Sequence, residues 1–218
     1  MRRWGRGATG ILLALLLGYS LPASRRKTPA AAAKFDYYLL SLSWAPAFCA
    51  TPGGGDTREC ASGRQLGFVV HGLWPQGNSG RGPENCQASQ PVAQSVMALT
   101  LNYIPTESLI QHEWATHGTC SGLNQADYFA AMRRARDSVV MPDVFKGPPK
   151  VLVLSPASIE EQFAAANPSF PRNAFRTACT AGRLSEVRVC FAKDLSPQAC
   201  TSATGSCSTK VMEVLPVR

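Results

Sequence analysis

Residues 112–120 read HEWATHGTC and hold His112 and His117, two of only three histidines among 218 residues. The third, His71, lies within residues 68–76, which read FVVHGLWPQ. A chain this poor in histidine that gathers all three beside tryptophan and glycine is expected to use them chemically. We interpret the two stretches as facing sides of one acid–base site. The alternative, in which the three are ordinary core residues, suits a lone histidine better than this grouping.

Helical spacing decides which of these side chains can act together. If residues 106–117 form a helix, Glu113 and His117 share one face and are about 40° out of line, since each residue turns the helix by about 100°. His112 and His117 would be about 140° apart. Both can still line one groove if Gly118 loosens the last turn or if the groove wraps around the helix end.

The same spacing argues against one alternative function, a secreted zinc hydrolase. Zinc metalloproteases use H-E-x-x-H, in which two histidines four residues apart bind one metal. Here the pattern is H-E-x-x-x-H, one residue too long, and His71 would have to complete the zinc ligands with the right geometry. No G-x-S-x-G motif indicates a serine nucleophile either. We therefore expect no metal and no other cofactor.

Hydrophobic patterns predict both strands and helices. Strands are expected at residues 34–44, 66–71, 183–191 and 210–217. Gly72 and Pro75 are expected to end the second strand. Helices are expected at residues 91–104, 106–117 and 156–166, with another opened by Asn124. This mixture predicts an α+β fold with a central, mainly antiparallel sheet and helices packed around it.

Two residues are expected to set the bounds of the helix that carries the histidines. Thr106 can cap its N-terminus through the side-chain hydroxyl. Gly118 can end it by adopting a left-handed conformation.

The N-terminal residues have the composition of a secretory signal peptide. Three arginines precede the apolar residues 11–17, and residues 21–24, LPAS, offer a small-residue cleavage site. The apolar run at residues 11–21 is shorter than the roughly 20 residues that span a bilayer. We expect a signal peptide at residues 1–23, with cleavage between 23 and 33. A single domain without a membrane segment would follow at residues 34–218.

Removal of this leader lowers the net charge. The whole sequence has 22 basic and 14 acidic residues, a formal charge of +8. Cleavage after Ala23 leaves 19 basic residues and a charge of +5, and cleavage after Ala33 leaves 16 and a charge of +2. A polyanion would therefore be held by a local site rather than by the overall charge of the protein.

All eight cysteines follow the leader. An even number of cysteines behind a signal peptide indicates disulfides and an oxidising compartment, so we expect a secreted or periplasmic protein. The close Cys-x-x-Cys pairs of structural zinc sites do not occur in the sequence. Spacing alone leaves the pairing of the cysteines open.

Two histidines and a glutamate without a protein nucleophile fit a substrate that supplies its own nucleophile. In RNA, the ribose 2′-hydroxyl can attack the adjacent phosphate. A neutral imidazole can accept the hydroxyl proton while an imidazolium protonates the departing 5′-oxygen. The unperturbed histidine pKa of about 6.5 suits both tasks.

Residues 68–76 and 112–120 resemble, in the same order, the two signature segments of the ribonuclease T2 family. This resemblance covers most of the chain after the leader. It implies an α+β fold with the first segment on a strand and the second on a helix. It also implies a metal-independent endoribonuclease that cleaves single-stranded RNA through a 2′,3′-cyclic phosphate to 3′-phosphate ends, with low base specificity. We expect no DNA substrate and a monomer.

The resemblance also assigns roles by motif position. His117 would be the general base on the 2′-hydroxyl, and His71 the general acid for the leaving oxygen. His112 would hold the phosphate, and Glu113 would help to stabilise the transition state. Trp74 would stack on a base, an interaction worth about 1–3 kcal/mol. The implied disulfides are Cys49–Cys60, Cys86–Cys120, Cys179–Cys207 and Cys190–Cys200.

Two positions in the segments leave questions open. Thr116 stands where the family usually has a lysine, whose charge would stabilise the phosphorane; threonine supplies only a hydroxyl. Either an arginine from elsewhere supplies that charge or turnover is reduced. This keeps open a second alternative, a catalytically weakened relative that binds RNA or a protein partner. Gln76 stands where some members carry aspartate for base selection, so base preference is open.

Overall fold

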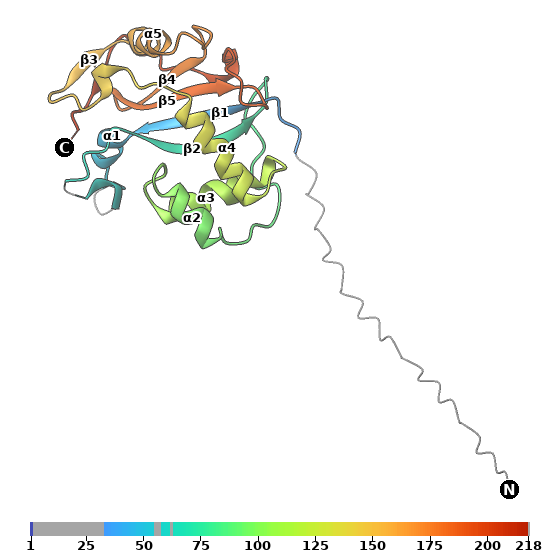
Figure 1. Cartoon of the computed structure of the whole chain (residues 1–218). Helices are drawn as coiled ribbons and strands as arrows, with labels where there is room; N and C mark the ends of the chain where they lie inside the picture. The colour runs from blue at the N-terminus through green and yellow to red at the C-terminus, as the bar shows by residue number, and fades with distance from the viewer. Residues whose placement is uncertain (2–32, 55–57, 62, 218) are drawn as a thin grey trace.

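The structure, a computed structural model, describes Met1 and residues 33–54, 58–61 and 63–217 (Figure 1). Apart from Met1, the expected signal peptide lies outside the described residues. The described residues contain a six-stranded sheet, helices and four disulfides, which confirms the predicted α+β fold. No helix among these residues is long and apolar enough to cross a membrane.

The sheet is mainly antiparallel, as predicted. Its main path runs β2-β1-β5-β6-β3, and β4 pairs with β5; only the β5–β6 pair is parallel. The strands are β1 (Tyr37–Trp44), β2 (Phe68–Gln76), β3 (Leu152–Leu154), β4 (Phe175–Thr180), β5 (Arg183–Phe191) and β6 (Met212–Val214). β1 lies between β2 and β5, so its aromatic and apolar residues are buried almost throughout.

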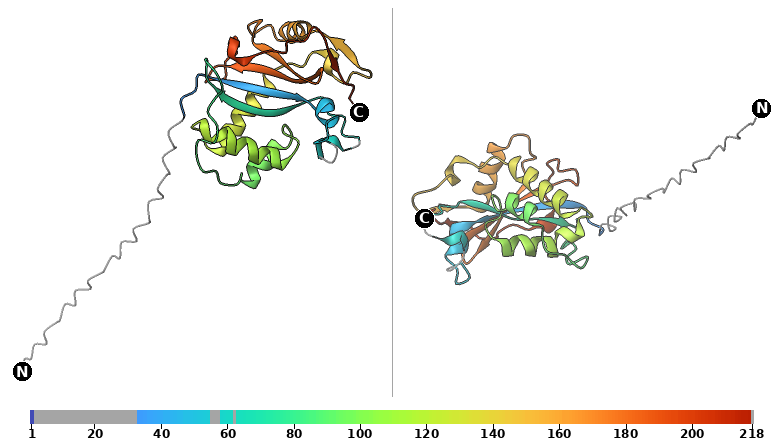
Figure 2. Two further views of the ribbon diagram at one scale, coloured as in Figure 1. Left: turned by 180° about the vertical axis from the view of Figure 1, so that it is seen from behind. Right: turned by 60° about the horizontal axis from the view of Figure 1, so that its bottom comes forward.

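The helices pack against this sheet. α2 and α3 lie together beside β2, and α5 lies with β3 and β4 at the other end of the molecule (Figure 1); Figure 2 shows the same arrangement from behind. α4 crosses β1 and β2. The helices are α1 (Ala45–Cys49), α2 (Gln94–Thr100), α3 (Glu107–Thr116), α4 (Gln125–Asp137) and α5 (Pro156–Ala166).

Side-chain oxygens cap three of these helices, two of them at Thr106 and Asn124, the residues that the sequence indicated. The hydroxyl of Thr106 accepts a hydrogen bond from the backbone N–H of Leu109 at 3.3 Å, which fixes the start of α3. Asn124 and Ser155 accept corresponding bonds at the starts of α4 and α5. The start of the histidine-bearing helix therefore follows from local chemistry.

The prediction that Gly72 and Pro75 end the second strand is wrong, because β2 continues to Gln76. The strand passes through a β-bulge: Ser41 pairs with Gly72, and the next residue of β1 pairs with Val70, so His71 is the extra residue. Pro75 is tolerated since β2 is an edge strand, where a missing N–H costs no ladder bond. The bulge places His71 outside the regular pairing.

Gly118 does not adopt the predicted left-handed conformation. It opens a 3₁₀ turn, Gly118–Cys120, and is not among the residues with positive φ. Its backbone lies so close to the Trp114 ring that a Cβ would overlap ring atoms. Glycine is required here by the close approach of an aromatic side chain, which the sequence pattern did not indicate.

Other predicted bounds were too long. The helix expected at residues 91–104 is α2, Gln94–Thr100, because the chain then turns and the carbonyl of Tyr103 accepts a hydrogen bond from the N–H of Val70 at 3.0 Å. The last strand is limited to three residues, Met212–Val214. β3 and β4 were not predicted; β3, with three residues, is too short to give a clear period.

The four disulfides join the pairs that the family resemblance implies: Cys49–Cys60, Cys86–Cys120, Cys179–Cys207 and Cys190–Cys200. The Cys86–Cys120 bridge joins the loop after β2 to the 3₁₀ turn after α3. The backbone N–H of Asn85 adds a 2.8 Å hydrogen bond to the carbonyl of Thr116. The end of α3, where His117 lies, is therefore tied to the neighbouring loop by a covalent bond and a hydrogen bond.

Candidate active site

β2 and α3 bring the histidine segments together. β2 supplies His71 and Trp74, while α3 supplies Glu113 and ends at His117. Glu113 is fully buried and His117 is 8% exposed, whereas His112 is exposed. Burial thus separates Glu113 and His117 from His112 along this segment.

Gly72 lets Glu113 reach β2. The indole N–H of Trp74 donates a 2.8 Å hydrogen bond to Glu113 Oε2. A Cβ at position 72 would overlap this carboxylate oxygen and come within 2.5 Å of the indole nitrogen. Because Gly72 of the first segment has no side chain, the Glu113 carboxylate of the second segment can occupy that space.

His71 is held between two carboxylates. Its Nδ1 lies 2.8 Å from Glu186 Oε1, and its Nε2 lies 3.7 Å from Glu113 Oε1. Burial alone would lower the pKa of His71. The hydrogen bond to Glu186 and the negative charges of Glu113 and Glu186 outweigh burial and the opposing charge of Arg188, so the pKa is raised above 6.5. His71 therefore favours the imidazolium form.

Glu186, on β5, is itself fixed by Arg188. The Nε and Nη2 groups of Arg188 both donate to Glu186 Oε2 at 2.9 Å. Burial would raise the pKa of Glu186, but the hydrogen bond to His71 and the charge of Arg188 outweigh it and lower the pKa to about 2. A nearly buried carboxylate therefore stays ionised beside His71.

His117 has the opposite environment. Its ring centroid lies 5.3 Å from that of Trp74. The Trp74 ring centroid in turn lies 5.0 Å from that of His71. Nδ1 of His117 is buried and has no hydrogen-bond partner. Burial, followed by the positive charges of His112 and His71, lowers the pKa of His117 to about 4. His117 is therefore neutral under conditions in which His71 is charged.

The pKa of Glu113 is shifted as well. Burial raises its pKa to about 7, although the charge of His71 and the hydrogen bond from Trp74 oppose the change. Its Oε1 is buried without a hydrogen-bond partner. A carboxyl with this pKa is largely protonated in mildly acidic solution and can then donate a hydrogen bond.

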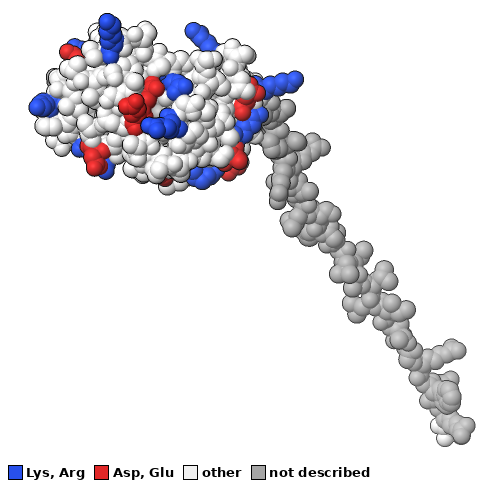
Figure 3. Space-filling model, turned by 90° about the horizontal axis from the view of Figure 1, so that it is seen from above, with Lys and Arg blue, Asp and Glu red and all other residues white. Residues whose placement is uncertain are grey.

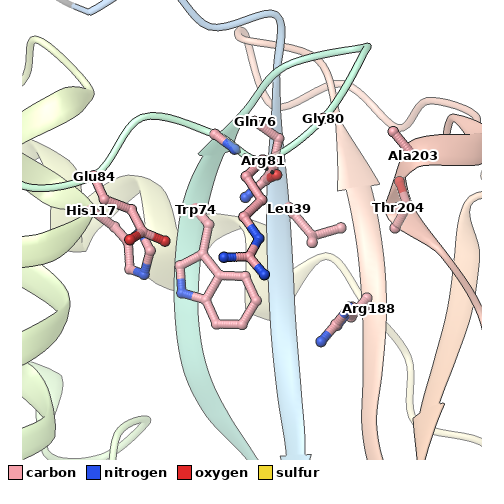
Figure 4. A pocket seen from close by; sticks show the side chains of 11 residues that line it. Leu39, Trp74, Gln76, Gly80, Arg81, Glu84, His117, Arg188, Ala203 and Thr204 are labelled. Atoms are coloured by element: carbon pink, nitrogen blue, oxygen red, sulfur yellow. Dashed lines mark hydrogen bonds between the residues drawn. The ribbon is translucent and has the colours of Figure 1, made fainter.

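A cavity of about 370 Å³ opens beside Trp74 and His117 (Figure 4). In this view the Trp74 ring stands between His117 and Arg188. The Cζ atom of Arg188 lies over that ring, 5.9 Å from its centroid. The cavity wall also includes Gln76, but its Oε1 already accepts a hydrogen bond from Gly82 N–H at 3.1 Å. Arg81 and Glu84 add one charge of each sign.

His112 and Thr116 lie on the other side of the site. The Thr116 hydroxyl is 3.5 Å from His112 Nδ1, and Thr116 is not part of the cavity beside Trp74. A second cavity, of about 360 Å³, is lined by His112 and also by His71. His71 therefore lines the cavity of His112 and contacts Trp74, which lines the cavity of His117.

Sequence reasoning missed the residues of β5 and of the loop after β2. Residues 183–191 were recognised only as an alternating strand, although Glu186 and Arg188 are charged residues two apart on it. Residues two apart on a strand share a face, so this pair was a signal for a polar site. Arg81 and Glu84 carried no such signal.

Comparisons with known proteins give the family of the chain. Residues 35–200 match the Ribonuclease T2 family. A ribonuclease of Aeromonas hydrophila is 44% identical over 99 residues, which cover 44% of this chain and 43% of that protein. A probable ribonuclease of Haemophilus influenzae is 35% identical over 126 residues, covering 52% and 46%. The chain spans about half the length of these curated relatives.

Among solved structures, a crystal structure of an RNase MC1 mutant in complex with 5′-UMP is 26% identical to this chain. It covers 83% of this chain and 98% of its own length, with a TM-score of 0.64. Its likeness therefore extends through the sheet and the helices around it. Because the family match spans more than half of the sequence and includes both histidine segments, this chain belongs to the ribonuclease T2 family.

Proposed function

We propose that this protein is an endoribonuclease that cleaves single-stranded RNA by attack of a ribose 2′-hydroxyl on the adjacent phosphate. The products would be a 2′,3′-cyclic phosphate and then a 3′-phosphate end. The observation that carries the proposal is the pair of histidines with opposite protonation preferences, His71 and His117, that flank Trp74. The family membership supports the same reaction class.

The pKa order gives the two imidazoles their roles. His117, with a pKa of about 4, is neutral and acts as the general base on the 2′-hydroxyl. His71, with its pKa raised above 6.5, is protonated and acts as the general acid for the departing 5′-oxygen. Because the pKa of the base is below that of the acid, the productive pair of protonation states is the dominant one between the two values.

Glu113 and His112 serve the phosphate. Glu113 helps to stabilise the transition state, where negative charge develops, from its buried position 3.7 Å from His71 Nε2. His112, exposed on the adjoining cavity, holds the phosphate. Neither role requires a metal or another cofactor.

Trp74 provides a stacking surface in the cavity beside His117. Stacking is worth about 1–3 kcal/mol per base and tolerates every base, which supports low base specificity. The 5′-UMP in the related RNase MC1 structure supports a nucleotide ligand. Basic and acidic side chains are interspersed on the face of the described residues in Figure 3, so substrate binding would depend on this local site.

We further propose that the protein acts as a monomer in an oxidising compartment outside the cytoplasm, and that DNA is not a substrate. Four disulfides support such a compartment. DNA lacks the 2′-hydroxyl that the proposed chemistry requires.

The test is cleavage of a synthetic single-stranded RNA by the purified protein, with and without EDTA, followed by analysis of the product ends. We expect equal rates in both conditions and a 2′,3′-cyclic phosphate that precedes the 3′-phosphate. An oligonucleotide of the same sequence with deoxyribose at every position is the matched control and should remain intact. Inhibition by EDTA would favour the zinc hydrolase, and 5′-phosphate products would exclude the proposed reaction.

Thr116→Lys provides a second test. We expect it to raise kcat/KM on single-stranded RNA by about tenfold, which corresponds to about 1.4 kcal/mol of transition-state stabilisation, because it adds a positive charge beside His112. Asn102→Lys, at an exposed position outside both cavities, controls for general attraction of RNA. An unchanged rate in the first variant would mean that another cation already neutralises the phosphorane.

A further inference from the structure

The orientation of His71 depends on a carboxylate from a different part of the chain. His71 is the bulged residue of β2, so the regular strand pairing does not fix its side chain. Its Nδ1 faces Glu186 at 2.8 Å, and its Nε2 faces Glu113 at 3.7 Å, beyond hydrogen-bond distance. A proton on Nδ1 is thus committed to Glu186, and Nε2 is the nitrogen left to act on a substrate.

Small residues on β1 make this contact across the sheet possible. β1 lies between β2 and β5, where Ser41 pairs with both Gly72 and Arg188, and Ser43 pairs with Glu186. Residues directly opposite one another share a face of the sheet. Side chains from β2 and β5 can therefore meet above the two serines, a space that larger residues would fill.

Arg188 holds Glu186 from the other side. Both of its hydrogen bonds go to Oε2, which leaves Oε1 for His71. The carboxylate side chain is 12% exposed, so an unpaired charge there would be costly. The guanidinium also lies over the Trp74 ring, at 5.9 Å from its centroid. These contacts form a chain from the stacking surface to the proposed general acid.

We infer that Glu186 and Arg188 are positioning residues of the active site, an inference that rests on the proposed function. Glu186 binds the Nδ1 proton of His71 and directs Nε2 toward the leaving oxygen. Arg188 orients Glu186 and keeps it in its charged form. The other titratable groups that act on His71 are Glu113 and, at longer range, Glu59 and His117.

Histidine NMR can test this inference without any activity measurement, because the chain has only three histidines to assign. We expect Glu186→Gln to lower the pKa of His71 by about one to three pH units, since it removes an opposite charge in direct contact. Arg188→Gln should raise that pKa, because it removes a like charge but keeps a side chain that can donate to Glu186, whose ionised form is also favoured by the hydrogen bond to His71. Shifts of opposite sign would not follow from a purely structural role.

Glu213→Gln is the matched control. Glu213 also pairs with an arginine of β5, Arg183 at 3.6 Å, but it does not contact His71. The His71 pKa should be unchanged in this variant. An unchanged His71 pKa in folded Glu186→Gln would overturn the inference. If that variant does not fold, Arg188→Gln decides, and a pKa of His71 that fails to rise would have the same meaning.

The pH dependence of kcat/KM links the contact to catalysis. In the unmodified protein, kcat/KM should rise as His117 loses its proton near pH 4 and fall as His71 loses its own above pH 6.5. Glu186→Gln should move only the falling limb to lower pH, with about a tenfold loss per pH unit of displacement in alkaline solution. If Glu186→Gln changes the His71 pKa measured by NMR but does not move the falling limb of kcat/KM, His71 is not the general acid. If the unmodified protein does not cleave RNA, the proposed function is rejected, but the contact between His71 and Glu186 is not.

Discussion

His117→Ala is expected to lower kcat/KM on single-stranded RNA by about 10²–10⁴-fold, the usual contribution of one positioned proton-transfer group. Without this imidazole, the 2′-hydroxyl would have only water as a base. The fold should persist, because His117 Nδ1 has no hydrogen-bond partner to lose and α3 is fixed by the Thr106 cap and the Cys86–Cys120 disulfide. Activity assays and thermal unfolding of the variant measure both expectations.

Binding separates this result from the alternative of a catalytically weakened relative. A 2′-O-methyl oligonucleotide cannot be cleaved by the proposed reaction and so reports binding alone. We expect His117→Ala to bind it about as tightly as the unmodified protein, because Trp74 and the remaining cavity residues are retained. If RNA binding is strong while the unmodified protein already cleaves no faster than the variant, the protein is a binding relative and not an enzyme.

Gly72→Ala is expected to have the largest effect on stability. The added Cβ would overlap Glu113 Oε2, and the fully buried Glu113 has no room to move away. Overpacking costs about 1–3 kcal/mol, and loss of the Trp74–Glu113 hydrogen bond adds about 1–3 kcal/mol for the polar group left buried. Any protein that still folds should also be nearly inactive, because Glu113 and Trp74 would both be displaced.

Urea unfolding and RNA cleavage measure these two effects. Gly77→Ala is the matched control, since it lies at the end of the same strand and its Cβ would meet only ordinary contacts, the nearest at 3.8 Å. That variant should lose little stability. Wild-type stability in Gly72→Ala would mean that α3 can move away from β2, contrary to the close packing described above.

The sequence by itself indicated the chemistry and determined most of the scaffold. Side-chain caps and the periods of apolar residues gave α3, α4, α5 and β5, because these signals act within a few residues of the chain. The spacing of Glu113, His112 and His117 likewise set which of them share a helix face. Two histidine segments without a protein nucleophile then indicated acid–base chemistry.

Only the tertiary structure decided how three chemically identical histidines differ. His71 and His117 have pKa values shifted in opposite directions because one meets Glu186 and Glu113, while the other is buried without an acceptor. Neither the bulge at His71 nor its contact with β5 has a local pattern, since both depend on strand register. Burial and charge at a site are set by residues distant in sequence, and these become neighbours only when the chain folds.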